Sequence, residues 1–65
     1  MGSGPATSTE VEIFGAVYSV RGGQDREHLQ GLAKTVDRTM RDISGRVATG
    51  DPTRIAILAA LNLAD

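Results

Sequence analysis

Few side chains in this 65-residue sequence could carry out chemistry. Nucleophilic catalysis needs a Ser, Thr or Cys beside a base, but the sequence has no cysteine and only one histidine, His28. A single histidine cannot build a metal site either, since such sites draw on several ligands. The Gly22-Gly23 pair lacks the spacing of a dinucleotide loop or a phosphate loop. We therefore expect no enzyme activity, no cofactor and no metal.

The acidic side chains have structural explanations, so no carboxylate pair is left for acid–base catalysis. Two of them stand where a helix is expected to begin, and two others lie four residues from an arginine on a helix surface. These are Asp25 and Asp51 as caps, and Asp37 with Arg41 and Asp42 with Arg38 as pairs.

Basic side chains form a stripe along the predicted first helix. The spacing of Lys34, Arg38 and Arg41 places them on the face opposite the apolar one, and Arg46 and Arg54 flank the loop that follows. Such a surface is either simply solvated or a docking surface for a partner. The formal net charge of −1 argues against general affinity for nucleic acids, which depends on a basic surface.

One long amphipathic helix gives the strongest periodic signal, and we predict it over residues 25–48. Asp25 is a good N-cap, Glu27 lies in the first turn where negative charge is favoured, and Gly50 suits the position after the C-terminus. At about 100° per residue the apolar side chains fall in one stripe. They are Leu29, Leu32, Ala33, Val36, Met40, Ile43 and Val47.

Two segments before this helix, residues 10–15 and 17–21, alternate polar and apolar side chains as strands do. We predict a β-hairpin with a type II′ turn at Gly15-Ala16, because glycine tolerates the positive φ of the first turn position. In this register one face carries Val11, Ile13, Tyr18 and Val20, and the other carries Phe14 and Val17.

A second helix is predicted from Asp51-Pro52 onward, with Asp as the cap and Pro at the first helical position. It is apolar nearly all round, and such a helix must be buried on every side. The hairpin and the first helix can cover only one of its faces, so we expect this short chain to form a homodimer. The expected interface is Ile57, Leu58, Leu61, Asn62 and Ala64, and the expected core is Val11, Ile13, Tyr18, Val20, Leu29, Leu32, Val36, Met40, Ile43, Ile55, Leu58 and Leu61.

Asn62 is the polar residue of this apolar helix. It shares a face with Ile55, Leu58 and Ala59. A buried amide there either fixes the register of paired helices or bonds a carbonyl within one chain.

The chain is expected to hold one domain. Residues 1–9 read as a flexible tail, in part a cloning remnant, and residues 10–65 as an α+β domain of ββαα order that is truncated within its last helix. No signal peptide is recognisable, and the longest apolar run, residues 55–61, is far shorter than the roughly 20 residues of a membrane span. We therefore expect a cytoplasmic protein.

Two strings, joined by the spacing between them, resemble the ZapA family of bacterial cell-division proteins. The resemblance covers about residues 10–65, and its more specific part is the alanine-rich string in the second helix. The matching positions are Val11-x-Ile13-Phe14-Gly15-x-x-Tyr18-x-Val20, Ala33-x-x-Val36-Asp37-x-x-Met40 and Ala59-Ala60-Leu61-Asn62-Leu63-Ala64-Asp65.

The resemblance implies a dimeric head domain that binds filaments of FtsZ at the division septum, bundles them and stabilises the Z ring. It also implies a coiled coil after the head, which joins dimers into tetramers and is missing here. Family members often carry a basic or long polar residue where this chain has Ala16. FtsZ filaments are acidic, so the expected contacts are basic: Lys34, Arg38, Arg41, Arg46 and Arg54.

Two alternatives stay open at this point. A small dimeric DNA-binding protein of ribbon–helix–helix type also combines strand and two helices, although Glu10 and Glu12 would repel phosphates. The other alternative is a pure oligomerisation module that has no ligand of its own.

Overall fold

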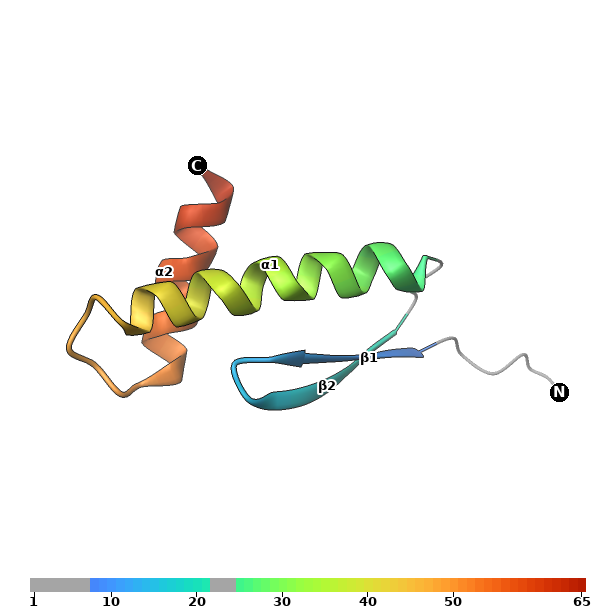
Figure 1. Cartoon of the computed structure of the whole chain (residues 1–65), viewed down its shortest axis with the longest axis horizontal. Coiled ribbons are helices and arrows are strands. Elements are labelled where there is room, and N and C mark those ends of the chain that lie inside the picture. Colours follow the sequence, from blue (N-terminus) through green and yellow to red (C-terminus); the bar gives the residue numbers. More distant parts are fainter. Residues whose placement is uncertain (1–7, 22–24) are drawn as a thin grey trace, which may run out of the picture.

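The computed structural model describes residues 8–21 and 25–65. Strands β1 (Ser8–Ile13) and β2 (Ala16–Arg21) form an antiparallel hairpin, followed by helices α1 (Arg26–Ser44) and α2 (Pro52–Ala64). Figure 1 shows α1 running along the hairpin while α2 crosses the C-terminal end of α1. The predicted ββαα order is confirmed. The Gly22-Gly23 turn and most of the predicted tail lie outside the described residues.

The strand β1 starts earlier than predicted. Ser8 and Thr9, assigned to the tail from the sequence, already pair with Arg21 and Val20. Thr9 is only 1% exposed, because its side chain lies on the same face of the hairpin as Val11. The tail prediction is therefore wrong for these two residues.

The hairpin turn also differs from the prediction. It is formed by Phe14 and Gly15, with φ of 53° and 84°, since Ile13 pairs with Ala16. Two successive positive φ values define a type I′ turn, which matches the twist of the flanking strands. Phe14 consequently does not project from the outer face beside Val17; it lies in the turn and packs against the core.

Both helices begin where the sequence predicted. The side chain of Asp25 accepts a hydrogen bond from the His28 N–H, and that of Asp51 accepts one from the Thr53 N–H. The predicted end of α1 is wrong by one turn, because the helix ends at Ser44 and not near residue 48. Gly45, a poor helix former, bonds both the Arg41 and Asp42 carbonyls through its N–H.

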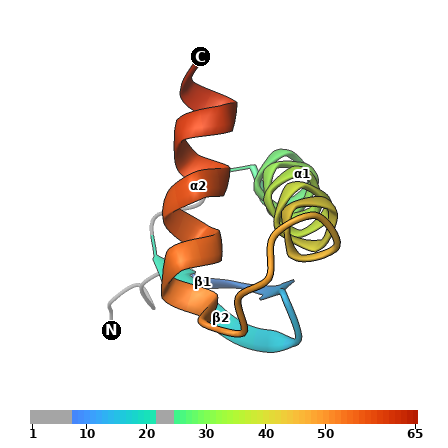
Figure 2. The same cartoon turned by 90° about the vertical axis from the view of Figure 1, so that its left-hand side faces the viewer.

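The core is small and sits where the two helices cross. Ile55 and Ala59 of α2, each 1% exposed, pack against Met40 and Ile43 of α1. Figure 2, turned by 90°, shows α2 standing beside α1 with the hairpin below. Around this cluster pack three partly buried side chains: Ile13, Phe14 and Val36.

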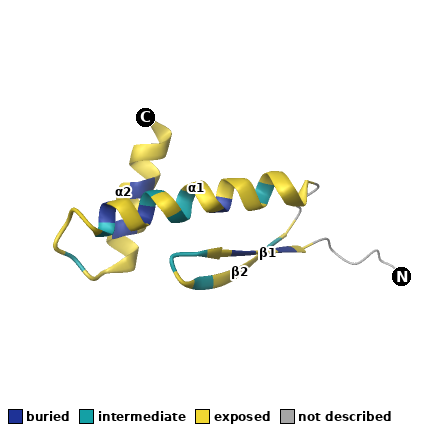
Figure 3. Cartoon of the chain, in the orientation of Figure 1, coloured by how far each residue is buried: buried dark blue, intermediate teal, exposed yellow. Residues whose placement is uncertain are grey.

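The described residues of one chain leave much of the predicted core uncovered. Val11, Met40, Ile43 and Ile55 are buried, and four others are half-buried. Figure 3 shows that most of α2 and β2 is exposed. The predicted core residues that are exposed in one protomer are Tyr18, Leu32, Leu58 and Leu61.

Candidate interaction surfaces

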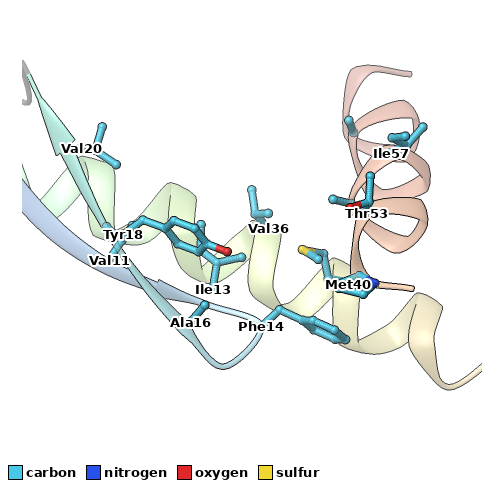
Figure 4. Close-up of a pocket in the computed structure, with 13 residues that line it drawn as sticks. Val11, Ile13, Phe14, Ala16, Tyr18, Val20, Val36, Met40, Thr53 and Ile57 are labelled. Carbon is cyan, nitrogen blue, oxygen red and sulfur yellow. The ribbon is translucent and has the colours of Figure 1, made fainter. Parts of the chain in front are cut away.

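An apolar groove opens between the hairpin and α2. We call it the hairpin–α2 groove; it has a volume of about 860 Å³. It exists because α1 packs on β1 and on α2, whereas within the described residues α2 packs on neither strand. Figure 4 shows Tyr18 and Ile13 on one side of it and Thr53 and Ile57 on the other. The groove is lined by Val11, Ile13, Phe14, Ala16, Tyr18, Val20, Val36, Met40, Pro52, Thr53, Ala56, Ile57 and Ala60.

The second uncovered apolar surface is the outer face of α2. Ile57 is 57% exposed and Leu61 is 66% exposed. Leucines and isoleucines grouped on one short helix in this way form a patch that water solvates unfavourably. The predicted interface residues Ile57, Leu58, Leu61, Asn62 and Ala64 are all exposed in the single chain.

Asp37 joins the hairpin turn to α1. Its Oδ1 accepts a hydrogen bond from the Phe14 N–H at 2.6 Å, and its carboxylate pairs with the Nε of Arg41 at 3.0 Å. The bond from Phe14, followed by that from Arg41, holds the pKa of Asp37 below its ordinary value of 3.8. Asp37 thus holds the turn backbone in place and also forms an ion pair with Arg41.

The three basic residues of the predicted stripe on α1, Lys34, Arg38 and Arg41, are all exposed. With Asp37, Lys34 and Arg41 border a second, polar groove of about 440 Å³ beside Glu10 and Glu12 of β1. Arg38 is not among the residues that line this groove.

Arg46 and Arg54 are exposed on either side of the interhelical loop, and Arg46 pairs with Asp42 at 3.2 Å. The Asp37–Arg41 pair was predicted correctly. The predicted Arg38–Asp42 pair is wrong, because Asp42 pairs with Arg46 instead.

In the ranges 8–21 and 25–65, His, Cys, Asp and Glu side chains form no group of three that could hold a metal ion. His28 is exposed, as expected from its position at the edge of the stripe.

Two features of these surfaces were missed from the sequence. The Phe14–Asp37 contact spans 23 residues, and nothing local to either residue indicates it. The α2 side of the groove did have a signal: Ala56, Ala60 and Ala64 recur every four residues, which places them in one row along the helix.

Fold and surfaces together define a small α+β domain with two apolar surfaces that the described residues do not cover. The chain belongs to the ZapA family of cell division proteins, whose sequence pattern matches residues 9–65. The ribbon–helix–helix alternative finds no support, because β1 pairs with β2 of the same chain.

Among its relatives, the cell division protein ZapA of Bacillus pumilus (strain SAFR-032) is 35% identical over 63 residues, covering 97% of this chain and 74% of the relative. ZapA of Bacillus thuringiensis (strain Al Hakam) is 35% identical over 60 residues, which cover 92% of this chain and 67% of the relative. The solved structure of a ZapA mutant dimer from Geobacillus stearothermophilus superposes with a TM-score of 0.76 at 30% identity, covering 98% of this chain and 74% of that one.

No helix among the described residues has both the length and the hydrophobicity needed to cross a membrane.

Proposed function

We propose that this chain is a non-enzymatic division protein that forms a homodimer in the cytoplasm, binds FtsZ filaments at the septum, promotes their bundling and stabilises the Z ring. The observation that carries the proposal is the uncovered apolar surface of α2 and the groove beside it, in a chain of the ZapA family. A mutant of the relative from Geobacillus stearothermophilus is described as a dimer, which supports the same state here.

Self-association is favoured by the energetics of a chain this small. Its buried cluster holds four residues, Met40, Ile43, Ile55 and Ala59. A single core of that size stabilises a fold only marginally, and the sequence has no cysteine for a disulfide. Burying Leu61 and Ile57 against a second copy would add about 1–2 kcal/mol for each side chain, since each is already partly buried.

Electrostatic attraction is the proposed basis of FtsZ binding. Of the five basic residues predicted to bind it, Arg41 and Arg46 are engaged with Asp37 and Asp42. Arg38, Lys34 and Arg54 are therefore the proposed primary contacts for an acidic filament, and the two paired arginines are secondary.

Co-sedimentation with FtsZ filaments tests this function. The unmodified chain is expected to pellet with the filaments at low salt and to dissociate as the salt rises from about 0.05 M to 0.5 M, since exposed charges are screened. Arg38→Glu should weaken pelleting, whereas Arg26→Glu, an equal charge change at the exposed start of α1, should not. Absence of pelleting at low salt, with a dimer confirmed in the same sample, would contradict FtsZ binding.

A further inference from the structure

We infer that the polar groove between β1 and α1 binds an extended peptide, which adds a strand to the hairpin. The peptide carries acidic side chains toward α1 and basic side chains on its other face. This β1–α1 groove shares only Val11 with the hairpin–α2 groove. The inference goes beyond the proposed function, because it needs neither an FtsZ filament nor a second copy of this chain.

The strand β1 has a free edge beside this groove. The two-residue turn makes Ile13 and Ala16 a hydrogen-bonded pair, and such pairs alternate along an antiparallel hairpin. The backbone N–H and C=O groups of Glu10 and Glu12 therefore point away from β2. Among the described residues, no backbone hydrogen bond from another element reaches these groups. An added strand bonds unpaired edge groups of this kind.

The groove has the shape that an extended peptide needs. Its lining includes residues 10–12 and no residue of β2, so it lies along the edge of β1 that is not paired with β2. Figure 1 shows α1 running beside β1 in the same direction. The α1 side reaches from Gln30 to Arg41, a rise of about 16 Å, which matches about five residues of a strand. Ala33, the buried α1 residue of the lining, is small and lets a peptide backbone approach.

The charges of the groove lie on two sides. Lys34 and Arg41 belong to α1, whereas Glu10 and Glu12 belong to β1 and are exposed. The side chains of an added strand point alternately to the two faces of the sheet. Acidic residues on the α1 face and basic residues beside the glutamates are favourable, which selects a peptide of alternating charge.

Asp37 is the third acidic residue of the lining, and it does not repel such a peptide strongly. Its carboxylate already accepts the hydrogen bond from the Phe14 N–H and pairs with Arg41. Because Arg41 is engaged in this pair, Lys34 is the main contact for an acidic side chain of the peptide.

A second copy of β1 does not suit this edge. Two antiparallel copies that pair through their outward groups place Glu10 of one copy opposite Glu12 of the other. Like charges directly opposite each other are destabilising. Charged side chains on an edge strand are also a usual means of preventing pairing between copies. The occupant is therefore a strand from a different protein, with basic residues opposite the glutamates.

A synthetic peptide tests the site. A blocked heptapeptide of alternating lysine and glutamate is titrated into the nitrogen-15-labelled chain and followed by NMR. The amides of Glu10 and Glu12 and those on the groove side of α1 should shift in a saturable way. The amides at the edge of β2, at Val17 and Ser19, should not shift. A peptide with the same residues in two blocks, lysines first, should bind about tenfold more weakly or worse.

Backbone methylation tests the added strand itself. In a strand, alternate N–H groups point to the same side. Methylating the lysine nitrogens removes the bonds of an antiparallel added strand, and methylating the glutamate nitrogens removes those of a parallel one. One of the two methylated peptides should therefore lose binding while the other keeps it. Unchanged affinity of both would contradict strand addition.

Charge reversals locate the two faces. Lys34→Glu and Glu12→Lys should each weaken binding of the alternating peptide by about tenfold, since each replaces an attraction with a repulsion. The double variant should recover much of this loss, because the peptide can shift by one residue and exchange its faces. Arg38→Glu reverses an exposed charge outside the groove and should leave the peptide affinity unchanged.

The outcomes separate this inference from the proposed function. No binding of the alternating peptide at about 1 mM, equal affinity for the block peptide, or shifts confined to β2 overturns the peptide site and leaves FtsZ binding untouched. Peptide binding without FtsZ pelleting supports the peptide site and contradicts only the FtsZ proposal. Arg38→Glu gives the same separation in one variant, because it should weaken pelleting and not peptide binding.

Discussion

The backbone N–H of Phe14 donates a hydrogen bond to Oδ1 of Asp37 across 2.6 Å, which joins the tip of the hairpin to the middle of α1. Phe14 has a φ of 53°, a conformation that bulky L-residues rarely adopt. The bond to Asp37 and the packing of the ring against the core offset this local cost. Asp37 thus holds the turn of the hairpin against α1.

Replacing Asp37 should therefore reveal two separate effects. Asp37→Ala removes both the Phe14 and the Arg41 contacts and should lower Tm by several degrees. Asp37→Asn keeps an acceptor for Phe14 and should lower it less. Asp42→Ala, which breaks only the exposed pair with Arg46, should have almost no effect, since such pairs contribute little. Equal losses for Asp37→Ala and Asp42→Ala in thermal unfolding would contradict the role of Asp37.

The same carboxylate predicts a pH dependence. The pKa of Asp37 is lowered in the folded chain, so the unfolded state binds its proton more readily. The stabilisation is therefore fully present above the ordinary value of 3.8 and is lost as the pH falls below it through the folded pKa. Denaturant titrations between about pH 2 and pH 6 should show a smaller acid-induced loss in Asp37→Asn than in the unmodified chain. Identical pH profiles would rule out Asp37 as the responsible group.

Two glycine substitutions should act in opposite directions. Gly15 has a φ of 84°, so Gly15→Ala should destabilise the chain by about 1 kcal/mol through backbone strain, although the added Cβ meets no atom within 4 Å. Gly31 lies inside α1 with the same free space, and Gly31→Ala should stabilise it by about 0.5–1 kcal/mol. Chemical denaturation measures both, and the same sign for the two changes would contradict the assigned turn.

Thr9 carries a buried hydroxyl that costs stability. Its Oγ1 has no hydrogen-bond partner within the described part of the chain, and the residue is 1% exposed. Thr9→Val replaces the hydroxyl with a methyl group of similar shape and should stabilise the fold by about 1 kcal/mol. Thr35→Val, at an exposed position of α1, is the control and should change stability by less than about 0.5 kcal/mol. A destabilised Thr9→Val chain would mean that the hydroxyl has a partner.

The sequence predicted those features whose causes are local. Asp25 and Asp51 cap their helices through residues two or three positions away, so their roles follow from short-range spacing. The turn was misassigned because Gly15 fits both a type II′ turn with Ala16 and a type I′ turn with Phe14. Asp37, 23 residues further on, bonds the Phe14 N–H in the turn that forms, and no local pattern contains that information.

The exposed apolar residues were predicted for a different reason. Leu61 and Ile57 lie on a helix that is apolar on opposing faces, and this excess is visible from helical periodicity alone. The surroundings of the basic residues could not be predicted in this way. Periodicity placed Lys34 and Arg41 away from the apolar stripe, but β1 packs beside α1 and brings them next to Glu10 and Glu12.

Leu61→Asp tests whether dimerisation and folding are linked. A charge placed on the uncovered face of α2 should abolish the dimer, and the remaining core should then be too small to hold the chain folded. Circular dichroism and light scattering should therefore show both losses together. Val17→Asp, at an equally exposed position on the outer face of the hairpin, should stay dimeric. A folded, soluble Leu61→Asp monomer would disprove the link.

The mass of the unmodified chain in dilute solution tests the central claim most directly. Light scattering coupled to gel filtration is predicted to give twice the 6.8 kDa of one chain, down to the lowest concentration at which the helices remain formed. A compact particle of 6.8 kDa with native circular dichroism would contradict obligate self-association.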